Sequence, residues 1–190
     1  MPLADIGVNL TDKRFANDRD AVLARAREAG VALQILTGTS VEGSAAALTL
    51  ARDHADLFCT VGIHPHHASE FAAHSEADLR QLAGHAKVCA IGETGLDFNR
   101  DFSPRPMQEN AFSRQLALAA DLGLPVFLHQ RDAHARFLPL LKEQRHQLPD
   151  VVVHCFTGNR AELFDYLDLD CHIGITGWIC DPRRGLELQQ

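Results

Sequence analysis

The sequence predicts an α/β protein in which parallel strands and helices alternate around a (β/α)8 TIM-type barrel. Short runs rich in Val, Ile and Leu recur along the chain, and a stretch with helical periodicity follows nearly every one. The units are about 25 to 35 residues long, as in barrels of this class. An open doubly wound sheet would carry a glycine-rich phosphate loop after its first strand, whereas the turn from Asn9 to Asp12 contains no glycine.

Each expected strand is one of these apolar runs. The runs lie near Ile6, Ile35, Val61, Ile91, Phe127, Val152 and Ile173. Three of them have bounds that the sequence defines closely: Val88 to Glu93, Pro125 to His129 and Val151 to His154. We therefore expect these three to be neighbouring parallel strands.

The intervals between the runs carry helix signals. In the first, Val22, Ala26 and Ala29 share one face, and Gly30 lies just past the expected end. A later helix is expected to open at Ser103-Pro104 and to stop at Gly123 and Pro125. Its expected buried face is Phe112, Leu116 and Ala119 or Ala120.

The expected barrel lacks one strand. With 190 residues, 46% of them hydrophobic, the chain can bury one core, so we expect residues 1–190 to form a single barrel domain. A complete barrel typically takes about 250 residues, and an eighth apolar run is absent from the sequence. We expect a C-terminally incomplete, apparently truncated domain whose strands near Ile6 and Ile173 expose unpaired apolar edges.

Composition narrows the function classes. The formal net charge of -7 disfavours a protein that binds nucleic acid through a basic patch. The chain has neither a signal-peptide pattern nor a run approaching the roughly 20 apolar residues of a membrane helix, so we expect no membrane partner and a cytoplasmic location. Five cysteines without CxxC spacing predict reduced thiols. We favour a monomer.

Three consecutive strands each end in a side chain that can bind a metal. These side chains are Glu93, His129 and His154. A lone histidine on a strand is more often a hydrogen-bonded core residue than a ligand. However, the C-terminal ends of parallel strands meet at one rim, where such folds place their chemistry. One carboxylate and two imidazoles at that rim predict a divalent-metal site.

Other residues at the same rim are candidates for substrate contacts. His64 ends the third strand in GIHPHH, where we expect it to meet a substrate phosphate rather than to be a simple loop histidine. Arg131 offers a planar guanidinium for phosphate oxygens, with Asp132 as an acceptor to hold it; a surface ion pair is the alternative. Because side chains alternate along a strand, Cys155 is expected to face the helices as a structural thiol.

The segments DIGVNL, GIHPH, IGETGLD, PVFLHQRDA, HCFTG and GITGW together resemble the TatD family of metal-dependent deoxyribonucleases, which are amidohydrolase-like barrels. The resemblance runs from Asp5 to about Leu188. It implies a metal-dependent hydrolase of DNA phosphodiester bonds, acting as a 3'-5' exonuclease on single-stranded DNA, with RNA as a further substrate. The implied cofactor is a divalent metal ion, Mg first and Mn or Zn as alternatives.

The resemblance also assigns roles to residues. It places Glu93, His129 and His154 at the metal, Glu93 and His64 in catalysis, and His64 and Arg131 in the substrate cleft. The chain departs from the family where the first strand usually carries an HxH pair, because Gly7 and Asn9 stand there. This departure implies one strongly held ion, or a second ion held weakly.

A second departure concerns the eighth strand. The family places a metal-binding aspartate there, and neither Asp97 nor Asp132 obviously substitutes for it. Two alternatives therefore remain beside the nuclease. One keeps the metal site but acts on an amide or ester, since barrels of this kind host many hydrolases. The other is an inactive truncated fragment.

Overall fold

A seven-stranded parallel sheet runs through the computed structural model, which describes residues 2–183, 185–186 and 188–189. The strands lie in the order of the sequence, each paired with the next. They are β1 (Leu3–Val8), β2 (Val31–Leu36), β3 (Leu57–Val61), β4 (Val88–Asp97), β5 (Val126–Arg131), β6 (Val151–His154) and β7 (His172–Ile173). The predicted α/β class and parallel order are confirmed.

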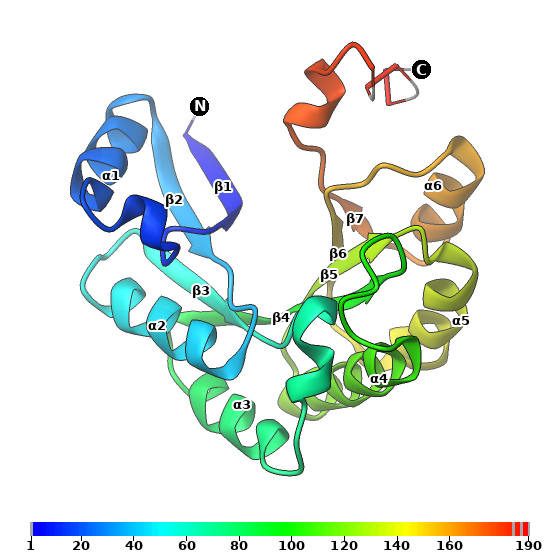
Figure 1. The fold of residues 1–190 in the computed structure, drawn as a ribbon. Coiled ribbons are helices and arrows are strands. Elements are labelled where there is room, and N and C mark those ends of the chain that lie inside the picture. The colour runs from blue at the N-terminus through cyan, green and yellow to red at the C-terminus, as the bar shows by residue number, and fades with distance from the viewer. Residues whose placement is uncertain (1, 184, 187, 190) are drawn as a thin grey trace.

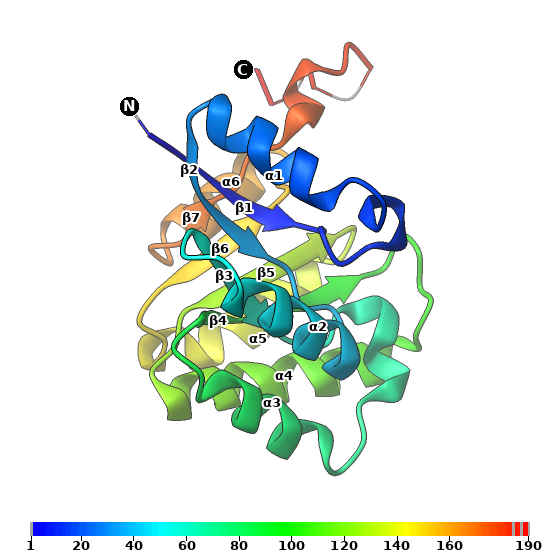
Figure 2. The ribbon, with the colours of Figure 1, turned by 90° about the vertical axis from the view of Figure 1, so that its left-hand side faces the viewer.

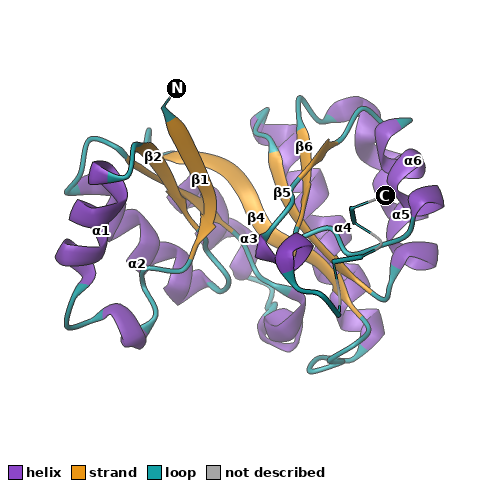
Figure 3. Ribbon diagram, turned by 90° about the horizontal axis from the view of Figure 1, so that it is seen from above, coloured by secondary structure: helices purple, strands orange, loops and turns teal. Residues whose placement is uncertain are grey.

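Helices fill the intervals between the strands. They are α1 (Arg19–Glu28), α2 (Val41–Arg52), α3 (Ser75–Ala83), α4 (Arg105–Leu122), α5 (His134–Gln144) and α6 (Arg160–Leu167), with short 3-10 turns η1 (Lys13–Phe15), η2 (Pro65–Glu70), η3 (Arg145–Gln147) and η4 (Gly177–Cys180). The sheet curls, and the helices lie on its outer side (Figure 1). Figure 2 shows the same arrangement from the side of β1 and α1, and Figure 3 shows it from above.

The two outer strands are open edges. Within the described residues β1 pairs only with β2, and β7 only with β6. Leu3 and Ile6 on β1 are 54% and 41% exposed, and Ile175 just beyond β7 is 51% exposed. The expectation of a barrel without its eighth strand, with apolar edges left unpaired, is therefore confirmed for the described chain.

The two helices predicted in detail had different outcomes. Pro104 precedes α4, which ends at Leu122, and its Phe112, Leu116 and Ala119 are buried as expected. For α1 the expected face was right in part: Val22 and Ala26 are half-buried, with Val22 packed against the core, but Leu23 is the fully buried residue and Ala29 is exposed. This helix lies beside the open edge of the sheet, so it has less surface to pack against and buries a narrower stripe.

β4 is longer than the sequence predicts. It continues past Glu93 to Asp97 and stays paired with β5, with a register shift between Gly92 and Thr94. Gly92 and Gly95 have φ of 141° and 146°, and a Cβ on Gly95 would overlap the carbonyl oxygen of His129. Glycine is thus what allows β4 to approach β5 so closely at the rim.

The composition-based expectations concern the cysteines and the length of the apolar segments. All five cysteines are free thiols, of which Cys59 and Cys171 are buried. Among the described residues, the helices are too short or too polar to cross a membrane.

Candidate metal centre

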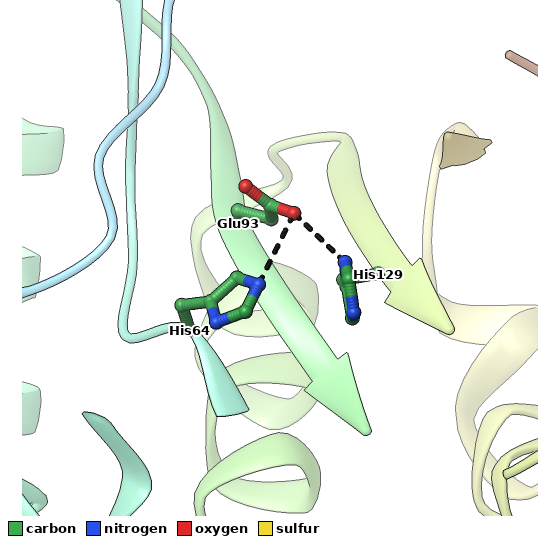
Figure 4. A group of neighbouring side chains, drawn as sticks. All are labelled: His64, Glu93 and His129. Carbon is green, nitrogen blue, oxygen red and sulfur yellow. Dashed lines mark hydrogen bonds and ion pairs between the residues drawn. The ribbon is translucent and has the colours of Figure 1, made fainter. Parts of the chain in front are cut away.

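One carboxylate oxygen gathers three imidazoles at the C-terminal rim of the sheet. Glu93 Oε1 lies 2.6 Å from His154 Nε2, 3.1 Å from His129 Nδ1 and 3.4 Å from His64 Nε2. Figure 4 shows His64 and His129 pointing at Glu93 from two sides. The structure therefore brings together the three residues predicted as metal ligands and adds His64 to them.

Strand register explains why these side chains meet. His129 pairs with Gly95 on β4 and with His154 on β6, so the two histidines stand side by side across adjacent strands. Glu93 lies at the register shift between Gly92 and Thr94, and its side chain reaches the same rim as His129 and His154. The predicted convergence at strand ends follows from this parallel pairing.

Burial and hydrogen bonding set the charge state of the group. Glu93 is only 8% exposed, and burial alone would raise its pKa, but the bonds from His129, His154 and His64 hold that pKa well below its usual range. Burial likewise works against protonation of His129, yet Asp97 and Glu93 raise its pKa to about 9. Burial lowers the pKa of His64 despite its contact with Glu93.

Asp97 is a site residue that the sequence analysis considered only as a substitute for the eighth-strand aspartate and did not place at the centre. Its Oδ2 lies 3.2 Å from His129 Nε2 and 2.8 Å from His66 Nε2, and its side chain is almost fully buried. Hydrogen bonds from both imidazoles help to hold the pKa of Asp97 well below its usual range, although burial opposes this. A signal was present: Asp97 follows Glu93 by four residues, and the two carboxylates bond to the two nitrogens of His129 because the strand continues that far.

The hydrogen bonds also separate the roles of the histidines. His129 Nε2 is bonded to an Asp97 oxygen that only accepts, so His129 Nδ1 is the nitrogen free to bind a cation once it is deprotonated. His64 Nδ1 accepts from the backbone N–H of His66 at 3.1 Å, which places the proton of neutral His64 on Nε2. His64 therefore faces the centre as a donor.

The side chains at this centre fit a divalent cation. A ring nitrogen of His64, a ring nitrogen of His129 and a carboxylate oxygen of Glu93 lie within 4.8 Å of one another, and His154 Nε2 reaches Glu93 Oε1. Mixed imidazole and carboxylate sites are typical for first-row divalent metals. The described residues thus contain a possible metal site.

A cavity opens over this group. Its lining comprises Gly7, Asn9, Thr39, His64, His66, His67, Glu93, His129, His154 and Cys155. Gly7 and Asn9, where the family's HxH pair would stand, therefore do border the site. The expected direction of Cys155 was wrong: β6 ends at His154, and Cys155 has φ of 50°, so strand alternation no longer applies and the residue borders the cavity.

Arg131 lies at the rim but does not line this cavity. Its guanidinium carbon is 5.1 Å from the ring centre of Trp178. Asp132 was expected to hold Arg131, but Asp132 Oδ2 accepts a hydrogen bond from Asn99 Nδ2 at 2.7 Å. Within the described chain, a ring rather than a carboxylate therefore positions this guanidinium.

The parallel barrel-like sheet and its acid-histidine group define the class of metal-dependent hydrolases built on (β/α)8 barrels. The family whose model matches is the TatD related DNase family, over residues 4–190. This chain belongs to that family, as its motifs predicted.

Relatives agree with this assignment. A protein of Erwinia amylovora named 3'-5' ssDNA/RNA exonuclease TatD is 57% identical over 187 residues, which are 98% of this chain and 72% of that protein. A Klebsiella pneumoniae protein of the same name is 53% identical over 186 residues, 98% of this chain and 71% of that protein.

Solved structures show the same fold. The TatD homologue YJJV of Escherichia coli K12 has a TM-score of 0.88 at 34% identity, covering 95% of this chain and 70% of that one. A TatD family hydrolase of Entamoeba histolytica has a TM-score of 0.86 at 30% identity, covering 93% of this chain and 65% of that one.

Proposed function

We propose that this protein is a metal-dependent exonuclease that removes nucleotides from the 3' end of single-stranded DNA, and of RNA, by hydrolysing phosphodiester bonds. The observation that carries the proposal is the meeting of three imidazole nitrogens at Glu93 Oε1 in a cavity at the strand ends. The names of the relatives favour this substrate over an amide or ester.

Each residue has a distinct part in the proposal. Glu93, His129 through Nδ1 and His154 through Nε2 hold the cation, with Mg first and Mn or Zn as alternatives. When bound, the cation lowers the pKa of a water and offsets charge on phosphoryl oxygens. His64 donates from Nε2 to a phosphate oxygen, and Arg131 binds the phosphate from the outer rim.

Neutral His64 suits the donor role better than a ligand role. Its Nε2 carries the proton as long as Nδ1 accepts from the His66 backbone. Asp97 has a supporting part, because its bond to His129 Nε2 keeps Nδ1 directed at Glu93. Sequence positions 7 and 9 offer no imidazole, which favours a single strongly held ion.

The test follows nucleotide release from a 5'-labelled single-stranded oligonucleotide with Mg, Mn or Zn. Glu93→Ala and His154→Ala are expected to lower the rate by about 100-fold or more. His74→Ala is the matched control. His74 is exposed, follows η2 in the sequence and lies outside the cavity lining. A ladder that shortens from the unlabelled 3' end establishes polarity.

The same assay separates the alternatives. Equal rates in wild type and both site variants would reject the assignment. Hydrolysis of small esters or amides without nucleotide release would favour the acyl hydrolase. Inactivity on every substrate would favour the inactive fragment. A monomeric state and a cytoplasmic location stay predictions from the sequence.

A further inference from the structure

An exposed aromatic ring stands beside the metal centre without a place in the core. Phe102, in the loop between β4 and α4, is 66% exposed. Its ring centre lies 4.7 Å from that of His66, edge to face, and the His66 ring centre lies 6.3 Å from that of His129. His66 itself borders the cavity over Glu93. Phe102 thus continues the rim of the site outward by one ring.

The loop that carries Phe102 is fixed at both ends to the site. Asp97 Oδ1 accepts two backbone hydrogen bonds, at 2.8 and 3.1 Å, from the residues that follow it. Ser103 Oγ donates to the carbonyl oxygen of His66 at 3.0 Å. An apolar ring that is presented to water on a fixed loop gains free energy when a flat ligand covers its face.

The net negative charge of the chain makes local contacts, such as this ring, important for binding a nucleic acid. A net charge of -7 leaves little general attraction for a phosphate backbone, so affinity for a nucleic acid has to come from local contacts. Stacking on an aromatic side chain is such a contact, and it accepts every base because every base has a π-face.

We propose that Phe102 is a stacking site for a nucleobase of the single-stranded substrate, next to the phosphate that His64 contacts. The proposal rests on the proposed function and adds a binding residue to it. His66 lies between Phe102 and the phosphate-binding residue, because its ring centre is 4.7 Å from that of Phe102 and 4.3 Å from that of His64. His66 supports the ring from the cavity side.

The test measures KM and kcat for a single-stranded oligonucleotide. Phe102→Ala is expected to raise KM by about 10-fold and to leave kcat within about 2-fold. Phe102→Leu keeps an apolar side chain but no ring, so it should behave like Phe102→Ala, whereas Phe102→Trp should restore KM to near the wild-type value. Phe164→Ala is the matched control, because Phe164 is 49% exposed on α6 and lies outside the lining of this cavity.

A second oligonucleotide, abasic at its last three 3' positions, isolates stacking from a structural effect. Wild type should show a raised KM for it, and Phe102→Ala should raise that KM no further. Restored binding in Phe102→Leu, an unchanged KM in Phe102→Ala, or an equal rise on both oligonucleotides would overturn the proposal.

A binding assay without cleavage tests the stacking site separately from the exonuclease activity. Fluorescence anisotropy of a labelled oligonucleotide measures affinity alone. Wild type that binds better than Phe102→Ala but releases no nucleotide would end the exonuclease assignment and keep the stacking site. Wild type that neither binds nor cleaves would reject both.

Discussion

The middle of the sheet and its two edges differ in how firmly the chain holds them. At the β4–β5 rim, Glu93 and Asp97 are buried, and each is bonded to more than one imidazole. At the edges, Ile6 and Ile175 are exposed, and β7 spans only two residues. The chemistry is therefore built where strands have neighbours on both sides. A site can be well formed in a sheet that is not closed.

The largest effect is expected where β4 and β5 approach most closely. Gly95→Ala would place a Cβ on the carbonyl oxygen of His129 at a φ of 146°, so we expect a loss of about 3 kcal/mol or more in the free energy of unfolding. Urea denaturation followed by circular dichroism measures this loss. Gly177→Ala is the control, because a Cβ there meets no atom within 4 Å. Equal stabilities of the two variants would contradict the packing argument.

A bound cation should stabilise the same middle region. At a concentration 100 times its Kd, a ligand that binds only the folded state adds about 2.7 kcal/mol, which raises the Tm of a protein of this size by about 5 to 10 °C. Thermal melting with and without Mn, and with excess chelator, measures the shift. Glu93→Gln should show no shift with Mn. A shift of the same size in that variant would place the cation elsewhere.

Asp97 should have a smaller effect, because it acts through His129. Asp97→Asn weakens the hydrogen bond that directs the ring, and changes to such supporting groups typically cost about 10 to 100-fold in metal affinity or activity. We expect the metal concentration for half-maximal activity to rise by about 10-fold, and saturating metal to restore much of kcat. Asp101→Asn is the control, because Asp101 is exposed and its partner is Arg105. Unaltered metal dependence in Asp97→Asn would argue against the positioning role.

The contrast between the middle and the edges of the sheet also explains which site residues the sequence predicts. Glu93, His129 and His154 could be placed together because each follows an apolar run and parallel strands end at one rim. Asp97 was not placed with them, because the apolar run ends at Glu93 and the further length of β4 depends on Gly92 and Gly95 fitting against the β5 backbone.

Cys155 and the open edges of the sheet show what a local pattern of residues can and cannot predict. The direction of Cys155 depends on a backbone φ of 50°, which is set by the end of β6 and not by the pattern of residues. The open edges were predictable, because they follow from counting strands. Local pattern thus identifies which residues reach the rim, whereas their contacts depend on how closely neighbouring strands pack.

The smallest effect on the folded state is expected at the edge. Ile6 on β1 is 41% exposed, so Ile6→Thr should change the free energy of unfolding by at most about 0.5 kcal/mol and leave nucleotide release unaltered. An exposed strand with unpaired backbone groups and apolar side chains is, however, a template for association between chains. Light scattering at rising concentration should therefore show less association in Ile6→Thr than in wild type. Ile91→Thr, at a fully buried position of β4, should instead unfold the protein more easily. If Ile6→Thr destabilised the chain as much as Ile91→Thr, the edge would be as firmly held as the middle, and the contrast between the two regions would fail.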